Sequence, residues 1–248
     1  MDSPGYIVLS HLVAAQRATA VTANNIANAD TPGFRASRPL FGTVLERQMD
    51  AAAPQGGRDL VFAQDRATWR DDAPAPLMRS GNPLDLALAD RNAFFAIETP
   101  RGERYTRAGR FTLDEEGQVV DPDGNAVLGA DNRPVRIEPG TVRIDIRGDG
   151  SIATENGPAG RLRILSFDDA QRLTAEGDRN LAAPADMRPR IVDQPGVVQG
   201  ATEGSNVRPV LELTRLTDEM RHFQFVAQMA EREGERLGSA VERILRRR

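Results

Sequence analysis

The chain has 248 residues, of which 40% are hydrophobic and 27% are charged, and its formal net charge is −4 at pH 7. It contains no cysteine, which excludes a disulfide framework, a thiolate metal site and sulfur redox chemistry. The net negative charge gives no general attraction to nucleic acid, and residues 246–248 are the one short basic segment that could bind it. No run of roughly 18 apolar residues indicates a membrane span.

The first 35 residues predict a helix that ends in a turn. Residues 6–28 contain neither Gly nor Pro, and Thr31-Pro32-Gly33 then ends the helix. Residues 1–5 lack the basic region of a signal peptide, so we expect no cleaved leader. A small-residue face repeats at the spacing of a heptad, at Tyr6, Leu9, Val13, Gln16, Ala20, Ala23 and Ala27.

The middle of the chain is punctuated by Gly, Pro and Asp. Residues 36–76 are expected to form an extended arm or linker, because 51–76 are rich in these residues and in Ala. Residues 77–182 predict an antiparallel β domain with meander-like connections, since short apolar runs alternate there with turn dipeptides such as Asp123-Gly124. The predicted strands cover residues 84–88, 94–98, 110–113, 118–120, 142–146 and 162–166.

A Pro- and Gly-rich connector is expected at 183–204, followed by a long helix at 205–248 that Ser205 or Asn206 would cap. The seam of this helix is about 30 residues long, on the order of 45 Å, which is too long to fold back onto a small β domain. Its a and d positions are Leu213, Leu216, Met220, Phe223, Ala227, Ala230, Gly234, Leu237, Val241 and Ile244.

These elements predict an α+β protein whose central β domain is flanked by long terminal helices with coiled-coil-like packing. The seam needs a helical partner, because each large apolar side chain left in water forfeits about 1.5–3 kcal/mol of burial. The two helices can pair with each other or with copies from neighbouring subunits, and the sequence leaves both arrangements open.

Features that resemble an active site have simpler interpretations. His11 and His222 lie in different predicted helices, so neither indicates acid–base catalysis. The run that begins at Asp121 has Asn132 where a calcium loop has its bidentate Glu, which favours a hairpin turn. We therefore expect no catalytic residue, no cofactor and no metal. For Asn24, Asn25 and Asn28 we favour inter-subunit hydrogen bonds through their side-chain amides.

One segment resembles a known family. Residues 24–35 resemble the signature of flagellar basal-body rod and hook proteins, and further motifs at 81–88, 104–111 and 200–214 follow in the order of that family. The resemblance covers nearly the whole chain. Its assembly signature falls on Asn24, Asn25, Ile26, Ala27, Asn28, Thr31, Gly33 and Phe34.

The resemblance is strongest to the proximal-rod members of the family, with the distal-rod members next. It implies a structural subunit, exported by the type III apparatus without signal cleavage, in a rod that spans the periplasm and transmits torque. Terminal helices would pack around the export channel, in contact with copies of this chain, other rod subunits and the export apparatus. No nucleic acid, membrane insertion or small-molecule substrate is implied. The alternatives are a hook-type axial subunit or a freestanding β-domain binding module whose helices dimerise.

Overall fold

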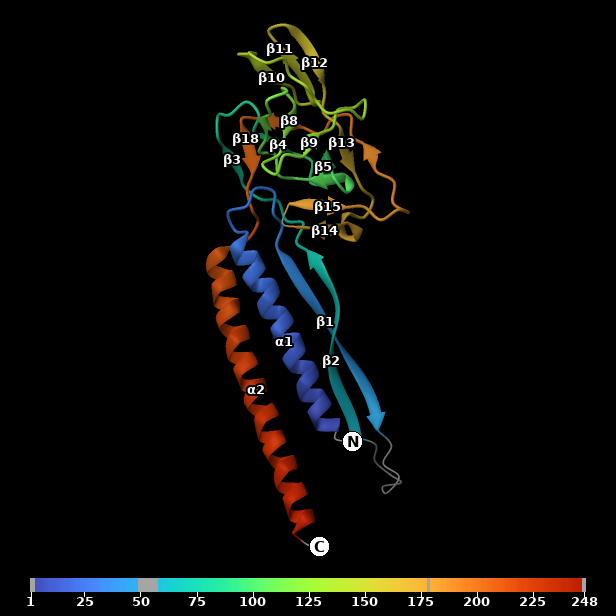
Figure 1. Cartoon of the computed structure of the whole chain (residues 1–248), viewed down its shortest axis with the longest axis vertical. Coiled ribbons are helices and arrows are strands. Elements are labelled where there is room, and N and C mark those ends of the chain that lie inside the picture. The colour runs from blue at the N-terminus through green and yellow to red at the C-terminus, as the bar shows by residue number, and fades with distance from the viewer. Residues whose placement is uncertain (1–2, 49–57, 178, 247–248) are drawn as a thin grey trace. The chain divides into compact units, whose positions relative to one another are not determined.

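The computed structural model describes residues 3–48, 58–177 and 179–246, which form two compact units (Figure 1). Unit 1 combines residues 1–27, 37–70 and 208–248, and unit 2 combines residues 28–36 and 71–207. Two long helices and a central antiparallel β region are both present, so the predicted α+β class is confirmed. None of the helices in the described ranges has both the length and the apolarity that crossing a bilayer requires.

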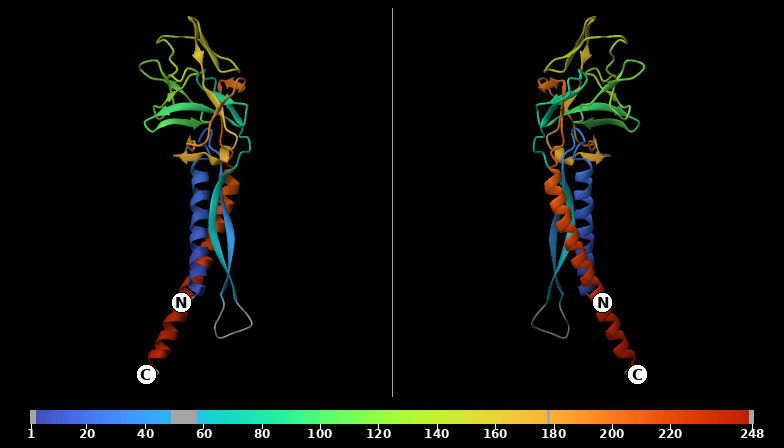
Figure 2. Two further views of the ribbon diagram at one scale, coloured as in Figure 1. Left: turned by 90° about the vertical axis from the view of Figure 1, so that its right-hand side faces the viewer. Right: turned by 90° about the vertical axis from the view of Figure 1, so that its left-hand side faces the viewer.

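Unit 1 joins both ends of the chain. Helix α1 (Ser3–Ala27) lies between helix α2 (Pro209–Leu245) and a two-stranded ribbon (Figure 1). The helices are antiparallel, because the end of α1 contacts the start of α2, and α2 runs on past the start of α1 (Figure 2). Helix α2 begins at a proline, whose fixed φ suits the first helical position. Neither Ser205 nor Asn206 is in the capping position, since the residue that directly precedes the helix is Arg208.

The ribbon consists of β1 (Ser37–Gln48) and β2 (Arg58–Arg70), paired antiparallel with a bulge between Leu40 and Phe41. It occupies most of the segment 36–76 that we expected as an extended arm, while residues 49–57 lie outside the described ranges. Pairing gives each strand hydrogen-bond partners that an isolated arm would have to find in water.

Unit 2 is an assembly of short antiparallel strands. The largest sheet has the order β14-β15-β6-β5-β9-β8-β7, and β13 joins β5 to β16. A separate three-stranded sheet has the order β10-β11-β12, and β17 and β18 pair with β4 and β3. The bounds are β3 Leu77–Arg79, β4 Leu86–Leu88, β5 Ala93–Thr99, β6 Gly102–Thr106, β7 Thr112–Leu113, β8 Val119–Val120, β9 Ala126–Val127, β10 Ile144–Ile146, β11 Ser151–Thr154, β12 Gly157–Arg161, β13 Ile164–Ser166, β14 Thr174–Glu176, β15 Asn180–Ala182, β16 Arg190–Ile191, β17 Val197–Gln199 and β18 Ala201–Glu203, with a 3-10 turn, η1, at Ala170–Arg172.

Every strand predicted from the sequence overlaps an observed one, and β5 forms the centre of the core. Phe95 packs edge-to-face on Phe111 at a centroid distance of 5.3 Å, while Phe94, on the other face of the same strand, packs on Phe167 at 5.9 Å. The expected connector, 183–204, contains β16, β17 and β18, which pair with earlier strands. This segment is therefore part of the β unit.

Candidate functional site

The signature segment is shared between the two units. Asn24, Asn25, Ile26 and Ala27 form the last turn of α1 in unit 1, whereas residues 28–36 belong to unit 2. Asn24 and Ala27 are exposed and Ile26 is half-buried. The motif thus occupies the point where the chain leaves the helical unit for the β unit.

Asn25 is fully buried and binds two elements of unit 1. Its Oδ1 accepts from the backbone N–H of Ser37 at 2.8 Å, and its Nδ2 donates to the Ser37 carbonyl at 2.9 Å and to Glu212 Oε2 at 3.3 Å. These bonds fix the start of β1 against the end of α1. The expectation of inter-subunit hydrogen bonds is therefore wrong for this residue, because its amide is engaged within the chain.

Glu212 is the centre of this network and is only 1% exposed. Both its oxygens accept from the guanidinium of Arg38, at 2.7 and 2.8 Å, and Oε1 also accepts from Arg215 at 3.0 Å. Burial alone raises the pKa of Glu212, but the hydrogen bonds from Arg38 and Asn25 outweigh it and hold this pKa below its usual value. An ionised carboxylate thus joins α1, β1 and α2.

Glu219 lies two turns further along α2 in a different environment. Its Oε1 accepts from Thr22 of α1 at 3.0 Å, and its Oε2 is buried without a hydrogen-bond partner in the described part of the chain. Burial and the nearby charge of Glu212 raise the pKa of Glu219, against the effect of the Thr22 hydrogen bond. The two carboxylates on this face of α2 therefore have opposite preferences for the proton.

The second half of the signature is a turn that packs on unit 2. The Thr31 hydroxyl donates to Asn28 Oδ1 at 3.0 Å, and the Gly33 N–H donates to the Glu203 carbonyl at 2.8 Å. Gly33 has φ of 73°, and a Cβ there would lie 2.5 Å from the Arg107 carbonyl carbon, so only glycine fits. Buried Phe34 packs with Ala36, Val207 and Ala29.

Two buried arginines fix this turn. Arg107 pairs with Glu203 at 2.5 Å and donates to the carbonyl oxygens of Leu88 and Ala93, among others. Arg35 pairs with Asp72 at 2.9 Å. Burial lowers the pKa of Arg107, and the charge of Glu203 opposes this effect. These interactions position the signature and involve no reacting group.

The predicted seam of α2 is only partly used within the chain. Leu213 is 52% exposed, Met220 is 50% exposed and Phe223 is also exposed, whereas Leu216, Ala227 and Ala230 are half-buried. The side chains of Leu237, Val241 and Ile244 lie outside the described residues. The described α2 residues that are buried are Glu212 and Val226, neither of which is in the seam. Coiled-coil packing along the predicted seam is therefore not confirmed.

The heptad face of α1 is exposed throughout. Tyr6, Leu9 and Val13 are 60%, 53% and 56% exposed, and the rest of that face is exposed as well. The residues that α1 buries within unit 1 lie elsewhere on the helix, at Ala15, Val21, Thr22 and Asn25.

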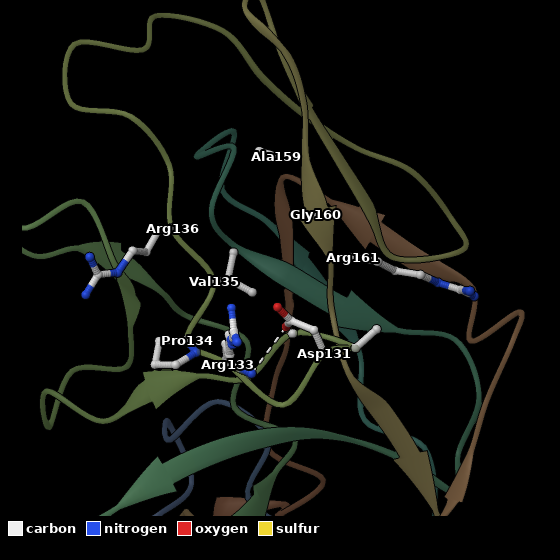
Figure 3. A pocket seen from close by; sticks show the side chains of 10 residues that line it. Asp131, Arg133, Pro134, Val135, Arg136, Ala159, Gly160 and Arg161 are labelled. Carbon is white, nitrogen blue, oxygen red and sulfur yellow. Dashed lines mark hydrogen bonds between the residues drawn. The ribbon is translucent and has the colours of Figure 1, made fainter.

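Concave features and titratable clusters give no sign of a reaction centre. A hollow of ≈ 670 Å³ in unit 2 is lined by three arginines and Asp131. Figure 3 shows Arg136 and Arg161 pointing away from it on opposite sides, and Asp131 accepts from the Arg133 N–H at 3.2 Å. The Asp121 segment forms a hairpin turn, in which Asp121 Oδ1 accepts from two backbone N–H groups. In the described ranges, no three acidic or histidine side chains lie close enough to hold a metal.

Three family models match successive parts of the chain. The model for "Flagella basal body rod protein" matches residues 6–35, which contain most of α1 and the whole signature. The model for "Flagellar hook protein FlgE/F/G D1 domain" matches residues 90–154 of unit 2. The model for "Flagellar basal body rod FlgEFG protein C-terminal" matches residues 198–243, from β17 into α2.

Curated proteins are similar over almost the same length. The flagellar basal-body rod protein FlgF of Caulobacter vibrioides is 32% identical over 98% of each chain, and the FlgF of Salmonella typhimurium is 31% identical over 90% of this chain and 91% of its own. The flagellar basal-body rod protein FlgG of Agrobacterium fabrum is 30% identical over 82% of this chain and 85% of its own.

Proposed function

The chain belongs to the flagellar basal-body rod protein family and is a structural subunit of the basal-body rod; we propose that it forms part of the proximal rod. It assembles there with other rod components and with copies of itself. Similarity to FlgF proteins over nearly the whole chain supports the proximal position, while the similarity to FlgG proteins keeps the distal rod as the alternative.

We further propose that the subunit polymerises through unit 1, so that its terminal helices line the export channel and transmit torque. The observation that carries this proposal is that helices from opposite ends of the chain meet in one unit and leave large apolar side chains exposed on both, Val13 on α1 and Leu213 on α2 among them. A soluble monomer gains nothing from such exposure, whereas a helical assembly buries it.

The accompanying proposals concern how the subunit reaches the rod. We propose that the type III export apparatus passes it outward without signal cleavage and that the rod crosses the periplasm. We also propose that the chain is not an enzyme. Membership of a structural family supports this, as does the engagement of the buried charged groups Glu212, Arg107 and Glu203 in ion pairs that fix the fold.

Deletion of the coding sequence tests the function directly. We expect cells without external filaments that do not swim, and restoration of both by the wild-type copy. Normal swimming after a clean deletion would refute the proposed function. An epitope inserted at Gly140, in an open turn of unit 2, and labelled in isolated basal bodies separates the alternatives, because label at the distal rod would contradict the proximal assignment.

Limited proteolysis of the monomer tests the competing view of a freestanding β-domain module. If unit 1 completes its packing only in the rod, protease should remove α1 and α2 first and leave a fragment close to residues 71–207. Ends as resistant as unit 2 would favour the freestanding module.

A further inference from the structure

Helix α1 presents an outer face that is unlike the solvated face of an ordinary amphipathic helix. It comprises Tyr6, Leu9, Val13, Gln16, Ala20, Ala23 and Ala27, all of them exposed. None of these side chains is ionisable near neutral pH, although solvent-facing helix surfaces normally carry charge. The only arginine of α1, Arg17, turns away to Asp65 and Thr68 of β2. The outer face of α1 thus has the uncharged composition of a buried helix surface.

A second unused surface runs along α2. We call it the α2 stripe, and its residues are Leu213, Thr217, Met220, Gln224, Ala227 and Gly234. Its beginning carries large exposed side chains and its far end carries almost none. At Gly234 an added Cβ would meet nothing within 4 Å, so no contact among the described residues requires glycine there. Glycine weakens a helix interior relative to alanine, and a second helix could approach this position more closely than it could approach a larger side chain. Glu231 lies in the same heptad row, between Ala227 and Gly234, and is the one ionisable residue of that row.

The two surfaces have complementary profiles. On α1 the large residues stand around Leu9 and the small ones around Ala23, while on α2 the large residues stand around Met220 and the small end is at Gly234. Each pair of positions is two heptads apart, about 21 Å at 1.5 Å per residue. Antiparallel helices therefore bring large against small at both ends, whereas parallel helices would bring large against large.

We propose that the outer face of α1 in one copy packs antiparallel against the α2 stripe of a second copy, with Ala23 opposite Met220 and Leu9 opposite Gly234. The chain's own α2 contacts α1 elsewhere, through Thr22 and Asn25. Because the two surfaces differ, the contact is heterologous. A pair of copies still has one free α1 face and one free α2 stripe, to which further copies can bind, as a growing assembly needs. A contact between two α1 faces would instead close a dimer. This pairing rests on the proposed rod function.

Cysteine cross-linking in assembled basal bodies tests the pairing, because the native chain has no cysteine. Copies with Ala23→Cys or Met220→Cys are produced singly and together in the deletion strain, and isolated basal bodies are oxidised with copper phenanthroline. We expect a cross-linked dimer only when both are present, since a disulfide requires Cα atoms about 4.4–6.8 Å apart. The matched control replaces Met220→Cys with Arg221→Cys. Arg221 is the next residue along α2, is exposed and does not belong to the stripe, so this pair should give no dimer.

A second pair, Gln16→Cys with Ala227→Cys, lies one heptad along the same alignment and should cross-link in the same way. Absence of a dimer from both pairs, with the substituted copies present in the basal bodies, would overturn the pairing and leave the rod function intact. A dimer from Ala23→Cys alone would replace it with an α1–α1 contact. Wild-type chain missing from purified basal bodies would instead refute the rod function itself.

Gly234→Leu gives an independent readout. The open space at this position means that the monomer should keep its helical circular dichroism, while the swimming halo should shrink to that of the deletion strain because the second copy cannot approach. Ser239→Leu, also exposed on α2, is the control and should swim normally. Full swimming with Gly234→Leu would show that this part of the stripe is not covered.

Discussion

Replacing Glu212 with Gln should destabilise unit 1 and leave unit 2 intact. The substitution keeps the size of the side chain but removes its charge and turns an amide N–H₂ toward donors that need an acceptor. Arg38 binds both carboxylate oxygens, and Asn25 and Arg215 bind one each. The change therefore affects α1, β1 and α2 together.

The expected magnitude follows from the burial of the carboxylate. Removing one partner of a buried ion pair costs about 3–5 kcal/mol, because the remaining charge is left uncompensated. Arg38 is partly exposed and recovers some hydration, and the amide that replaces the carboxylate retains one acceptor oxygen. We expect a loss of about 3 kcal/mol in the free energy of unfolding of unit 1, toward the lower end of that range. Asp218→Asn, which breaks an exposed pair with Arg221 at 3.8 Å, should cost less than about 0.5 kcal/mol.

Urea unfolding of the monomer measures this difference. Ellipticity at 222 nm reports α1 and α2, and fluorescence reports Trp69 of β2, the only tryptophan, so both signals come from unit 1. Amide hydrogen exchange around Phe95 reports unit 2 and should not change. If Glu212→Gln unfolds within about 0.5 kcal/mol of the wild type, the carboxylate does not hold the three elements together, and the account of the site is wrong.

Three other changes have defined outcomes. Burial raises the pKa of Glu219, so the stability that this residue contributes is complete at acidic pH and is lost as pH rises through that pKa. Glu219→Gln should therefore stabilise unit 1 against urea at about pH 7 and have little effect near pH 4. Gly33→Ala should lower the thermal midpoint of unit 2, measured by scanning calorimetry, since its methyl group would overlap the Arg107 backbone. Leu216→Asp should leave unit 2 folded in the same assay but abolish swimming, because a charge would enter an apolar helix interface.

The sequence predicted six strands of unit 2, namely β4, β5, β7, β8, β10 and β13, because turn signals lie close to their ends. Turn pairs such as Asp123-Gly124 and Asp149-Gly150 fix short hairpins, and both glycines have the positive φ that such turns require. The ribbon β1–β2 was missed because residues 51–76, which contain β2, are rich in Ala, Gly, Asp and Pro, a composition that indicates a linker. The short strands β16 and β18 were missed because they acquire their partners, β13 and β3, from distant parts of the chain.

The sequence predicted the signature motif but not the buried hydrogen-bond network that joins it to β1 and α2. Residues 24–35 are recognisable in the sequence because they resemble the signature of the rod and hook protein family. Nothing near Glu212 indicates that it will meet Arg38, 174 positions away, or that Asn25 will join them. A polar network of this kind forms only when three separate elements pack together, so its members resemble ordinary surface residues in the sequence.

The row of α2 that faces α1 was also hidden in the sequence because it is partly polar. Glu212, Glu219 and Val226 also recur every seven residues, and this row faces α1 within the chain. Two of its members are carboxylates, so a search for apolar spacing passes over it and finds the neighbouring row that includes Leu213 and Met220. Inside the subunit the row of Glu212 meets α1 through the polar contacts with Thr22 and Asn25 and includes the buried Val226, while Leu213 and Met220 remain exposed. The strongest hydrophobic repeat of this chain is therefore not the row that carries the contacts between α1 and α2 within the subunit.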